Sequence, residues 1–215
     1  VPFAVNVSAA EASETVRPFL PIAERLGELF ASLSGLAGSL EIDYQGQIAG
    51  YDTRILTLAV LKGFFGRVSD QPVSYVNAPA LAAERGIEVR ESSTSTAHDY
   101  VNLISLRGGG HALAGTLVGL KGEPRIVMVD DHTVDVPPAR HMLVVRNEDR
   151  PGMIGVVGTV LGRAGINIAD MDVGQSAAGV PALMVLATSE AVPAEVQEEL
   201  RAADGIVSVH AIELS

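Results

Sequence analysis

The strongest constraint on this chain is the order of predicted elements in its last 75 residues. Four short segments alternate apolar and polar residues or run apolar throughout, which is typical of strands. Two longer segments show helical spacing and are followed by a glycine. The order strand–helix–strand–strand–helix–strand defines the split βαβ, ferredoxin-like plan, in which two helices cover one face of an antiparallel sheet. The predicted strands are 142–145, 166–173, 182–187 and 206–214, and the predicted helices are 151–164 and the segment beginning at Pro193.

Two local irregularities in this region carry further predictions. The apolar alternation slips by one residue at Ala169-Asp170, and a β-bulge would absorb that slip. In the preceding helix, Gly155, Gly158 and Gly162 each cost about 1 kcal/mol relative to alanine. We expect these glycines to allow close packing against another helix, in preference to hinge behaviour.

The first part of the chain predicts a mixed α/β domain. Its predicted helices are 22–30, 53–65 and a short helix after Asn77, and its predicted strands are 40–44, 87–90, 100–106, 112–120 and 125–129. Pro137-Pro138 disfavours both helix and sheet and is the best candidate boundary. We therefore predict an α+β chain, with a connector and mixed domain over 1–138 and a ferredoxin-like domain over 139–215.

Composition excludes several classes of function. The net charge of −11 without a basic cluster argues against a nucleic-acid partner. The absence of cysteine removes thiol chemistry and, with no secretory pattern, favours a cytoplasmic protein; no apolar run is long enough to span a membrane. The histidines lack metal-ligand spacing, Gly108 to Gly110 is typical of a hairpin turn, and no cofactor motif is present. We expect no metal, no cofactor and no catalytic residue in this chain.

A candidate ligand site lies at the junction between the strand at 142–145 and the next helix. A helix N-terminus carries unpaired N–H groups and a partial positive charge, which suit a carboxylate. Asp149 suits an ammonium group, Asn147 could reach a small side chain, and Gly152 lets backbone approach a ligand. The competing interpretation is that Asp149 only caps the helix while Asn147 and Arg150 are solvated. The candidate residues are Asn147, Asp149, Arg150, Pro151 and Gly152.

The run His141 to Gly155, followed by Gly165 to Met171, resembles an ACT domain, an amino-acid-sensing regulatory module. The whole chain resembles the C-terminal half of the D-3-phosphoglycerate dehydrogenase family, through Ala4 to Asn6, Arg17 to Leu20 and Val76 to Pro79. In that family an NAD-binding catalytic half precedes an intervening, allosteric substrate-binding domain and an ACT domain. Residues Val1 to Val7 have no helix start and are typical of an extended connector, and we expect this chain, which begins with Val, to be a piece of a longer protein.

The resemblance also implies a ligand. In the family, L-serine binds between the ACT domains of two subunits and inhibits the enzyme. Asp149 matches the position that contacts the ammonium group, and Asn167 matches an asparagine contributed from the second strand, across the interface. Asn147 matches a flanking position that is His or Tyr in some members, so this residue departs from the family pattern.

Some family members bind anions at the intervening domain through basic side chains. The corresponding candidates here are Lys121, Arg125, His132 and Arg140. Because Asp130-Asp131 would repel anions, ordinary solvated charges are the favoured interpretation of these four residues.

The sequence thus predicts a regulatory and oligomerising fragment of a serine-pathway dehydrogenase. Its expected partners are L-serine or a similar small amino acid and further copies of the chain, as a dimer or tetramer. Two alternatives stay open. One is a purely structural oligomerisation module with a vestigial site, and the other is the regulatory part of an L-serine dehydratase.

Overall fold

A computed structural model describes residues 14–36, 38–130, 132–174 and 181–215. The chain divides into two compact units, Val1–Ile126 and Val127–Ser215. The boundary predicted after residue 138 lies further along the chain. The predicted N-terminal connector lies outside the described residues, and so does the turn that the sequence places at Ser176 to Gly179, between the predicted strands 166–173 and 182–187.

The first sheet has the strand order β2-β1-β3-β4-β5-β6. β1 (Ser39–Gly46) runs parallel to β2 (Glu88–Thr94) and antiparallel to β3 (Asn102–Gly108), which pairs antiparallel with β4 (His111–Val118). The predicted mixed α/β character is confirmed. Gly109 and Gly110, with φ of 58° and 81°, make the tight β3–β4 hairpin that the sequence predicted.

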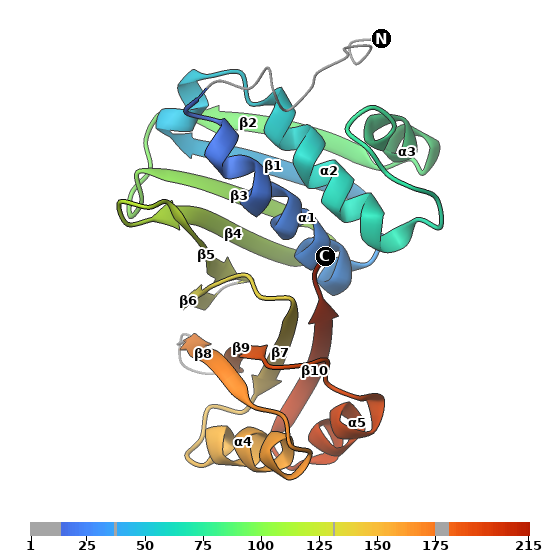
Figure 1. Ribbon diagram of the computed structural model, residues 1–215, viewed down its shortest axis with the longest axis vertical. Helices are drawn as coiled ribbons and strands as arrows, with labels where there is room; N and C mark the ends of the chain where they lie inside the picture. Colours follow the sequence, from blue (N-terminus) through green and yellow to red (C-terminus); the bar gives the residue numbers. More distant parts are fainter. Residues whose placement is uncertain (1–13, 37, 131, 175–180) are drawn as a thin grey trace. The chain divides into compact units, whose positions relative to one another are not determined.

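Two long helices, α1 (Leu20–Ser34) and α2 (Arg54–Val68), pack on each other against this sheet (Figure 1). Their backbones approach closely at two glycines. A Cβ added at Gly27 would lie 2.1 Å from the carbonyl oxygen of Val60, and one at Gly63 would lie 2.0 Å from that of Glu24. Only glycine therefore fits at either position. A third helix, α3 (Ala78–Glu84), and two 3-10 turns, Arg17–Phe19 and Gln47–Gly50, complete these elements.

The structure contains a strand that the sequence did not predict, β6 (His132–Val136), which follows β5 (Glu123–Val129). His132, Val134 and Val136 are buried and the two residues between them are exposed, which is the period-two pattern of a strand. Within the second unit, β6 packs against β8 and β9. The ladder ends before Pro137-Pro138, as expected of residues that cannot donate to it.

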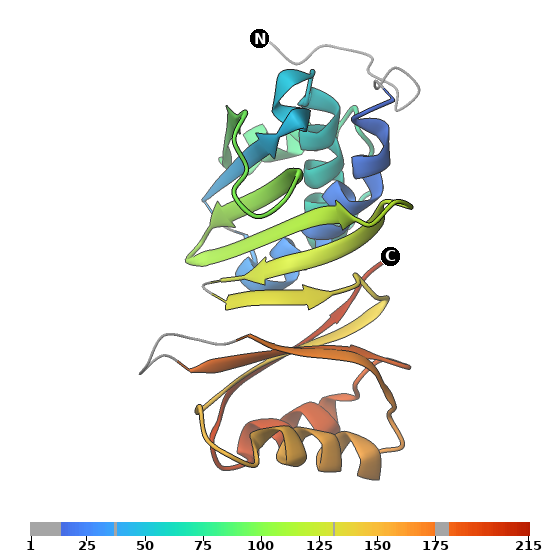
Figure 2. The same ribbon diagram turned by 90° about the vertical axis from the view of Figure 1, so that its left-hand side faces the viewer.

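The second unit has the predicted order, β-α-β-β-α-β, after β6. Its sheet has the strand order β10-β7-β9-β8, and the three pairings are antiparallel. Both helices cover one face, here called the helix face (Figure 2). The elements are β7 (His141–Asn147), α4 (Met153–Arg163), β8 (Ile168–Gly174), β9 (Ala182–Thr188), α5 (Ala194–Ala202) and β10 (Ile206–Glu213). The ferredoxin-like prediction is confirmed.

One of the two local predictions holds. The β8–β9 register shifts between Ile168 and Asp170, so the predicted bulge is confirmed. The expected close packing at Gly155, Gly158 and Gly162 is wrong within this chain. A Cβ at any of these three positions would meet no described atom within 4 Å, because the glycines lie on the side of α4 away from the core.

Among the described residues, no helix is long and apolar enough to cross a membrane.

Candidate functional site

The candidate site is built where β7 ends and α4 begins. β7 lies between β10 and β9, and its last residue, Asn147, pairs across the sheet with Ile206 on one side and Ala182 on the other. Residues alternate along the strand, so Asn147 shares the helix face with the core residues Leu143 and Val145. The chain then turns through 148–152 into α4.

Asn147 is a polar residue in an apolar position. It is 2% exposed, its Nδ2 donates to the carbonyl oxygen of Glu148 at 2.7 Å, and its Oδ1 has no hydrogen-bond partner among the described residues. The carbonyl of Glu148 can only accept, which fixes the orientation of the amide and leaves Oδ1 as the free acceptor. Because a buried unpaired acceptor costs about 1–3 kcal/mol, a donor from a ligand would relieve a real penalty.

The N-terminus of α4 is open. Its first residue is preceded by Gly152, which has a φ of 97° and leaves open space where a Cβ would stand. No described side chain caps the helix. The first N–H groups of a helix have no intrahelical partner, so they can bind an anion here. Pro151 and Asp149 are exposed just before this end.

Arg150 holds the loop in place. Its guanidinium pairs with Asp204 at 2.6 Å and with Glu148 at 3.3 Å, and the hydrogen bond to Asp204 raises the pKa of Arg150. The backbone N–H of Glu148 also donates to Gly205 at 2.8 Å. The loop is therefore tied to the turn before β10. Arg150 thus helps to hold the loop to the turn before β10, whereas the sequence analysis grouped it with the candidate ligand contacts.

The remaining predicted residue, Asn167, lies at the other end of α4. It is exposed, and its backbone exchanges hydrogen bonds with Ser189, to Oγ at 3.1 Å and from N at 2.9 Å. The 11 residues of α4 separate the two ends by about 16 Å. Within one chain, Asp149 and Asn167 cannot contact the same small molecule.

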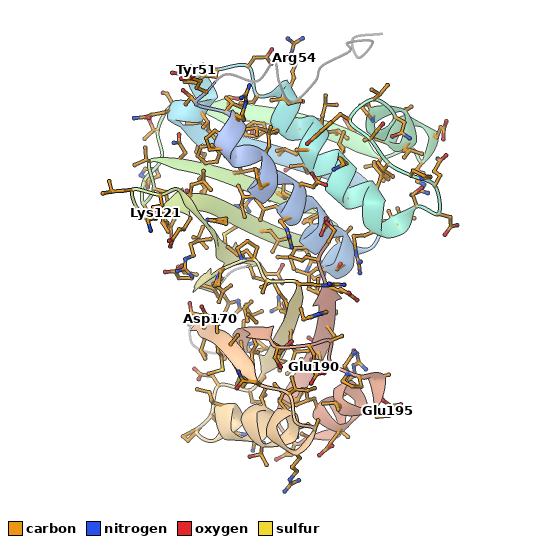
Figure 3. All side chains as sticks on the ribbon, in the orientation of Figure 1. Tyr51, Arg54, Lys121, Asp170, Glu190 and Glu195 are labelled. Atoms are coloured by element: carbon orange, nitrogen blue, oxygen red, sulfur yellow. The ribbon has the colours of Figure 1, made fainter. Side chains whose placement is uncertain are left out.

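The four candidates for an anion site are divided between the two units, and their surroundings differ. Lys121 projects from the turn between β4 and β5 (Figure 3), and Arg125 is half-buried on β5. His132 is fully buried, with its Nε2 2.8 Å from the carbonyl oxygen of Pro181. Arg140 pairs with Glu213 at 3.3 Å.

Sequence reasoning missed the side chains that hold the site in place. Asp204 lies 54 residues after Arg150, with which it pairs, and Gly205 accepts from the backbone of Glu148. Arg146, next to Asn147, pairs with Asp130. The one local signal was Gly205, which has a φ of 85° and follows the last helix. Within the described parts of the chain, no group of three or more His, Asp and Glu side chains could hold a metal ion.

Comparison with known proteins agrees with this architecture. Residues 15–130 match the family described as the D-3-phosphoglycerate dehydrogenase intervening domain, and residues 141–205 match the ACT domain family. The D-3-phosphoglycerate dehydrogenase of Mycobacterium leprae is 35% identical over 221 residues, which cover 100% of this chain and 42% of that protein. Those of Archaeoglobus fulgidus and Bacillus subtilis are 36% and 34% identical, each covering 98% of this chain and 41% of the relative.

The chain thus spans about two fifths of the length of these relatives. An ACT domain behind an intervening domain defines the regulatory part of an enzyme. This chain belongs to the D-3-phosphoglycerate dehydrogenase family and corresponds to the C-terminal half of its members.

Proposed function

We propose that this chain senses L-serine for feedback inhibition of the dehydrogenase, binding one molecule at the β7–α4 junction of each ACT domain. The observation that carries the proposal is the buried, unpaired Oδ1 of Asn147, at the end of the strand that leads into the open N-terminus of α4. We assign NAD binding and catalysis to the part of such dehydrogenases that this chain does not span.

Each polar group of serine has a counterpart at this junction. The carboxylate accepts from the first N–H groups of α4, where Gly152 keeps the approach open. The carboxylate of Asp149 accepts from the ammonium group. The serine hydroxyl donates to Oδ1 of Asn147, so the ligand removes the penalty of that buried acceptor. Alanine and glycine lack this donor and should bind more weakly.

The complete site requires two chains. Asp149 and Asn167 lie at opposite ends of α4, so a second chain must supply Asn167 if both contact one ligand. An antiparallel arrangement of two α4 helices brings the start of each beside the end of the other. Such an arrangement is isologous and creates two equivalent sites per dimer. Serine then stabilises the dimeric arrangement in which both halves of the site meet.

Isothermal titration of L-serine into this chain tests the proposal, with L-alanine, glycine and D-serine as competitors and sedimentation to follow the oligomeric state. We expect one site per chain and a preference for L-serine over L-alanine of about tenfold, which corresponds to one net hydrogen bond. Asp149→Asn should weaken binding about ten- to a hundredfold, because a hydrogen bond to a charged group contributes about 1.5–3 kcal/mol.

Glu195→Gln is the matched control, since Glu195 is an exposed carboxylate on α5 of the same unit (Figure 3). This variant should bind serine as the unchanged chain does. An assembled dimer that binds no amino acid would contradict sensing and leave oligomerisation as the function. In an intact dehydrogenase carrying this chain, Asp149→Asn should relieve inhibition by L-serine.

A further inference from the structure

The segment that contains β6 is fastened to the second sheet on the face opposite the helices. Asp130, just before this strand, forms an ion pair with Arg146, whose side chain is 25% exposed against 11% for Asp130. Nε2 of His132 donates to the carbonyl oxygen of Pro181 at 2.8 Å, and the backbone N–H of Asp135 donates to Asp172 at 2.6 Å. These contacts tie one short segment to three parts of the second unit.

Two of these contacts lie at the ligand end of the sheet. Arg146 immediately precedes Asn147 on β7, and Pro181 immediately precedes Ala182, which is the cross-strand partner of Asn147. Successive residues of a strand point to opposite faces. A displacement of the Asn147–Ala182 pair on the helix face is therefore passed directly to Arg146 and Pro181, which hold Asp130 and His132.

The packing around His132 leaves little room for independent movement. His132 is fully buried, and a Cβ added at Gly174 on β8 would lie 2.7 Å from the Cβ of His132. Its Nδ1 has no partner among the described residues, so the bond to Pro181 is the hydrogen bond that orients the ring. The ring must therefore follow any shift of the backbone at Pro181.

We propose that Asp130 and His132 form the contact through which a ligand bound at Asn147 and Asp149 holds β6 more firmly in place. The proposal rests on the proposed function, because it assumes a ligand at that site. A ligand that fixes the 147–152 loop also fixes Arg146, and its ion pair then holds Asp130 and the start of β6. β5, which precedes Asp130, spans the boundary between the two compact units. The restraint that the ligand places on Asp130 therefore reaches the first unit along the chain.

Hydrogen exchange of the backbone amides of β6, measured with and without saturating L-serine, tests the contact, and calorimetry measures binding on the same samples. In the unchanged chain, serine should slow the exchange of 132–136 by about fivefold or more, the low end of typical coupling between sites. Asp130→Asn removes the charge that pairs with Arg146. Asn tolerates the positive φ of 52° found at Asp130, so this variant should still fold.

In Asp130→Asn, serine should bind but no longer slow the exchange of β6. Glu213→Gln is the matched control, because it removes the carboxylate that pairs with Arg140 at the other end of β7 and should leave the response intact. The coupling would be overturned if serine still slowed the exchange of β6 in Asp130→Asn. It would also be overturned if this slowing disappeared equally in Glu213→Gln. Serine binding without any change in β6 would overturn it too. If the unchanged chain binds no serine, the proposed function itself fails, and this outcome is visible by calorimetry alone.

Discussion

Because α1 and α2 approach closely, replacing glycine by alanine should have opposite effects on stability at two positions of α2 that are three residues apart. Gly63 and Gly66 both lie in α2, but only Gly63 faces α1. A Cβ at Gly63 would lie 2.0 Å from the carbonyl oxygen of Glu24, whereas one at Gly66 meets nothing within 4 Å among the described residues. Gly63→Ala should therefore destabilise the first unit, and Gly66→Ala should stabilise it.

The magnitudes follow from two terms. Replacing a helical glycine by alanine contributes up to about 1 kcal/mol at either position. At Gly63 the added Cβ must gain about 1 Å of separation, since carbon–oxygen contacts below 3.0 Å essentially never occur. Overpacking of this kind costs about 1–3 kcal/mol, and more where backbone blocks the new atom. We expect a net loss of about 2 kcal/mol in the free energy of unfolding for Gly63→Ala and a gain of about 0.5 kcal/mol for Gly66→Ala.

Urea unfolding followed by tyrosine fluorescence measures both effects. The four tyrosines, Tyr44, Tyr51, Tyr75 and Tyr100, all lie in the first unit, and the chain has no tryptophan, so the signal reports that unit. The two variants should move the urea midpoint in opposite directions at an unchanged slope. Equal shifts of the same sign would refute the argument that a helix–helix contact requires glycine at position 63.

Two further predictions concern single residues. Burial raises the pKa of Tyr44, whose hydroxyl bonds Thr57 at 2.7 Å, so above about pH 10 the unfolded chain releases a proton that the folded chain keeps. Between pH 9 and pH 11, stability should then fall by about 1.4 kcal/mol in total more than in Tyr44→Phe, as measured by urea midpoints from circular dichroism; equal losses in the two proteins would contradict this. Gly205 has a φ of 85°, and a Cβ added there would lie 2.5 Å from Nη2 of Arg150. Gly205→Ala should therefore destabilise the second unit by about 1–2 kcal/mol and speed amide exchange in β10, and unchanged exchange would contradict this.

The β-α-β-β-α-β part of the second unit, from β7 to β10, could be predicted because each of its elements carries its own local signal. The spacing of apolar residues identifies its strands and helices, and glycine or proline ends them. The resulting order of elements is that of the ferredoxin-like fold. β6 was missed although His132, Val134 and Val136 alternate with exposed residues. The strand has five residues and runs into Pro137-Pro138, so its pattern is too short to separate from a linker.

The position of the candidate site could be predicted, but its internal contacts could not. Asn147, Asp149 and Gly152 lie within six residues of one another, and a strand-to-helix junction brings them together locally. Arg150 was grouped with them for the same reason, yet its guanidinium pairs with Asp204, 54 residues away. Which of several nearby charges a flexible arginine selects depends on the tertiary structure, and no spacing in the sequence records that choice.

The glycines of α4 show how the same sequence signal can refer to different partners. Gly27 and Gly63 allow two helices of this chain to touch, because the space between α1 and α2 at these positions leaves no room for a side chain. Gly155, Gly158 and Gly162 cost about 1 kcal/mol each, yet no described atom lies close enough to use the space they leave. A close helix contact that would offset this cost must come from outside the described chain. The antiparallel dimer proposed above places a second α4 on this face, where both the glycines and the separated Asp149 and Asn167 have a role.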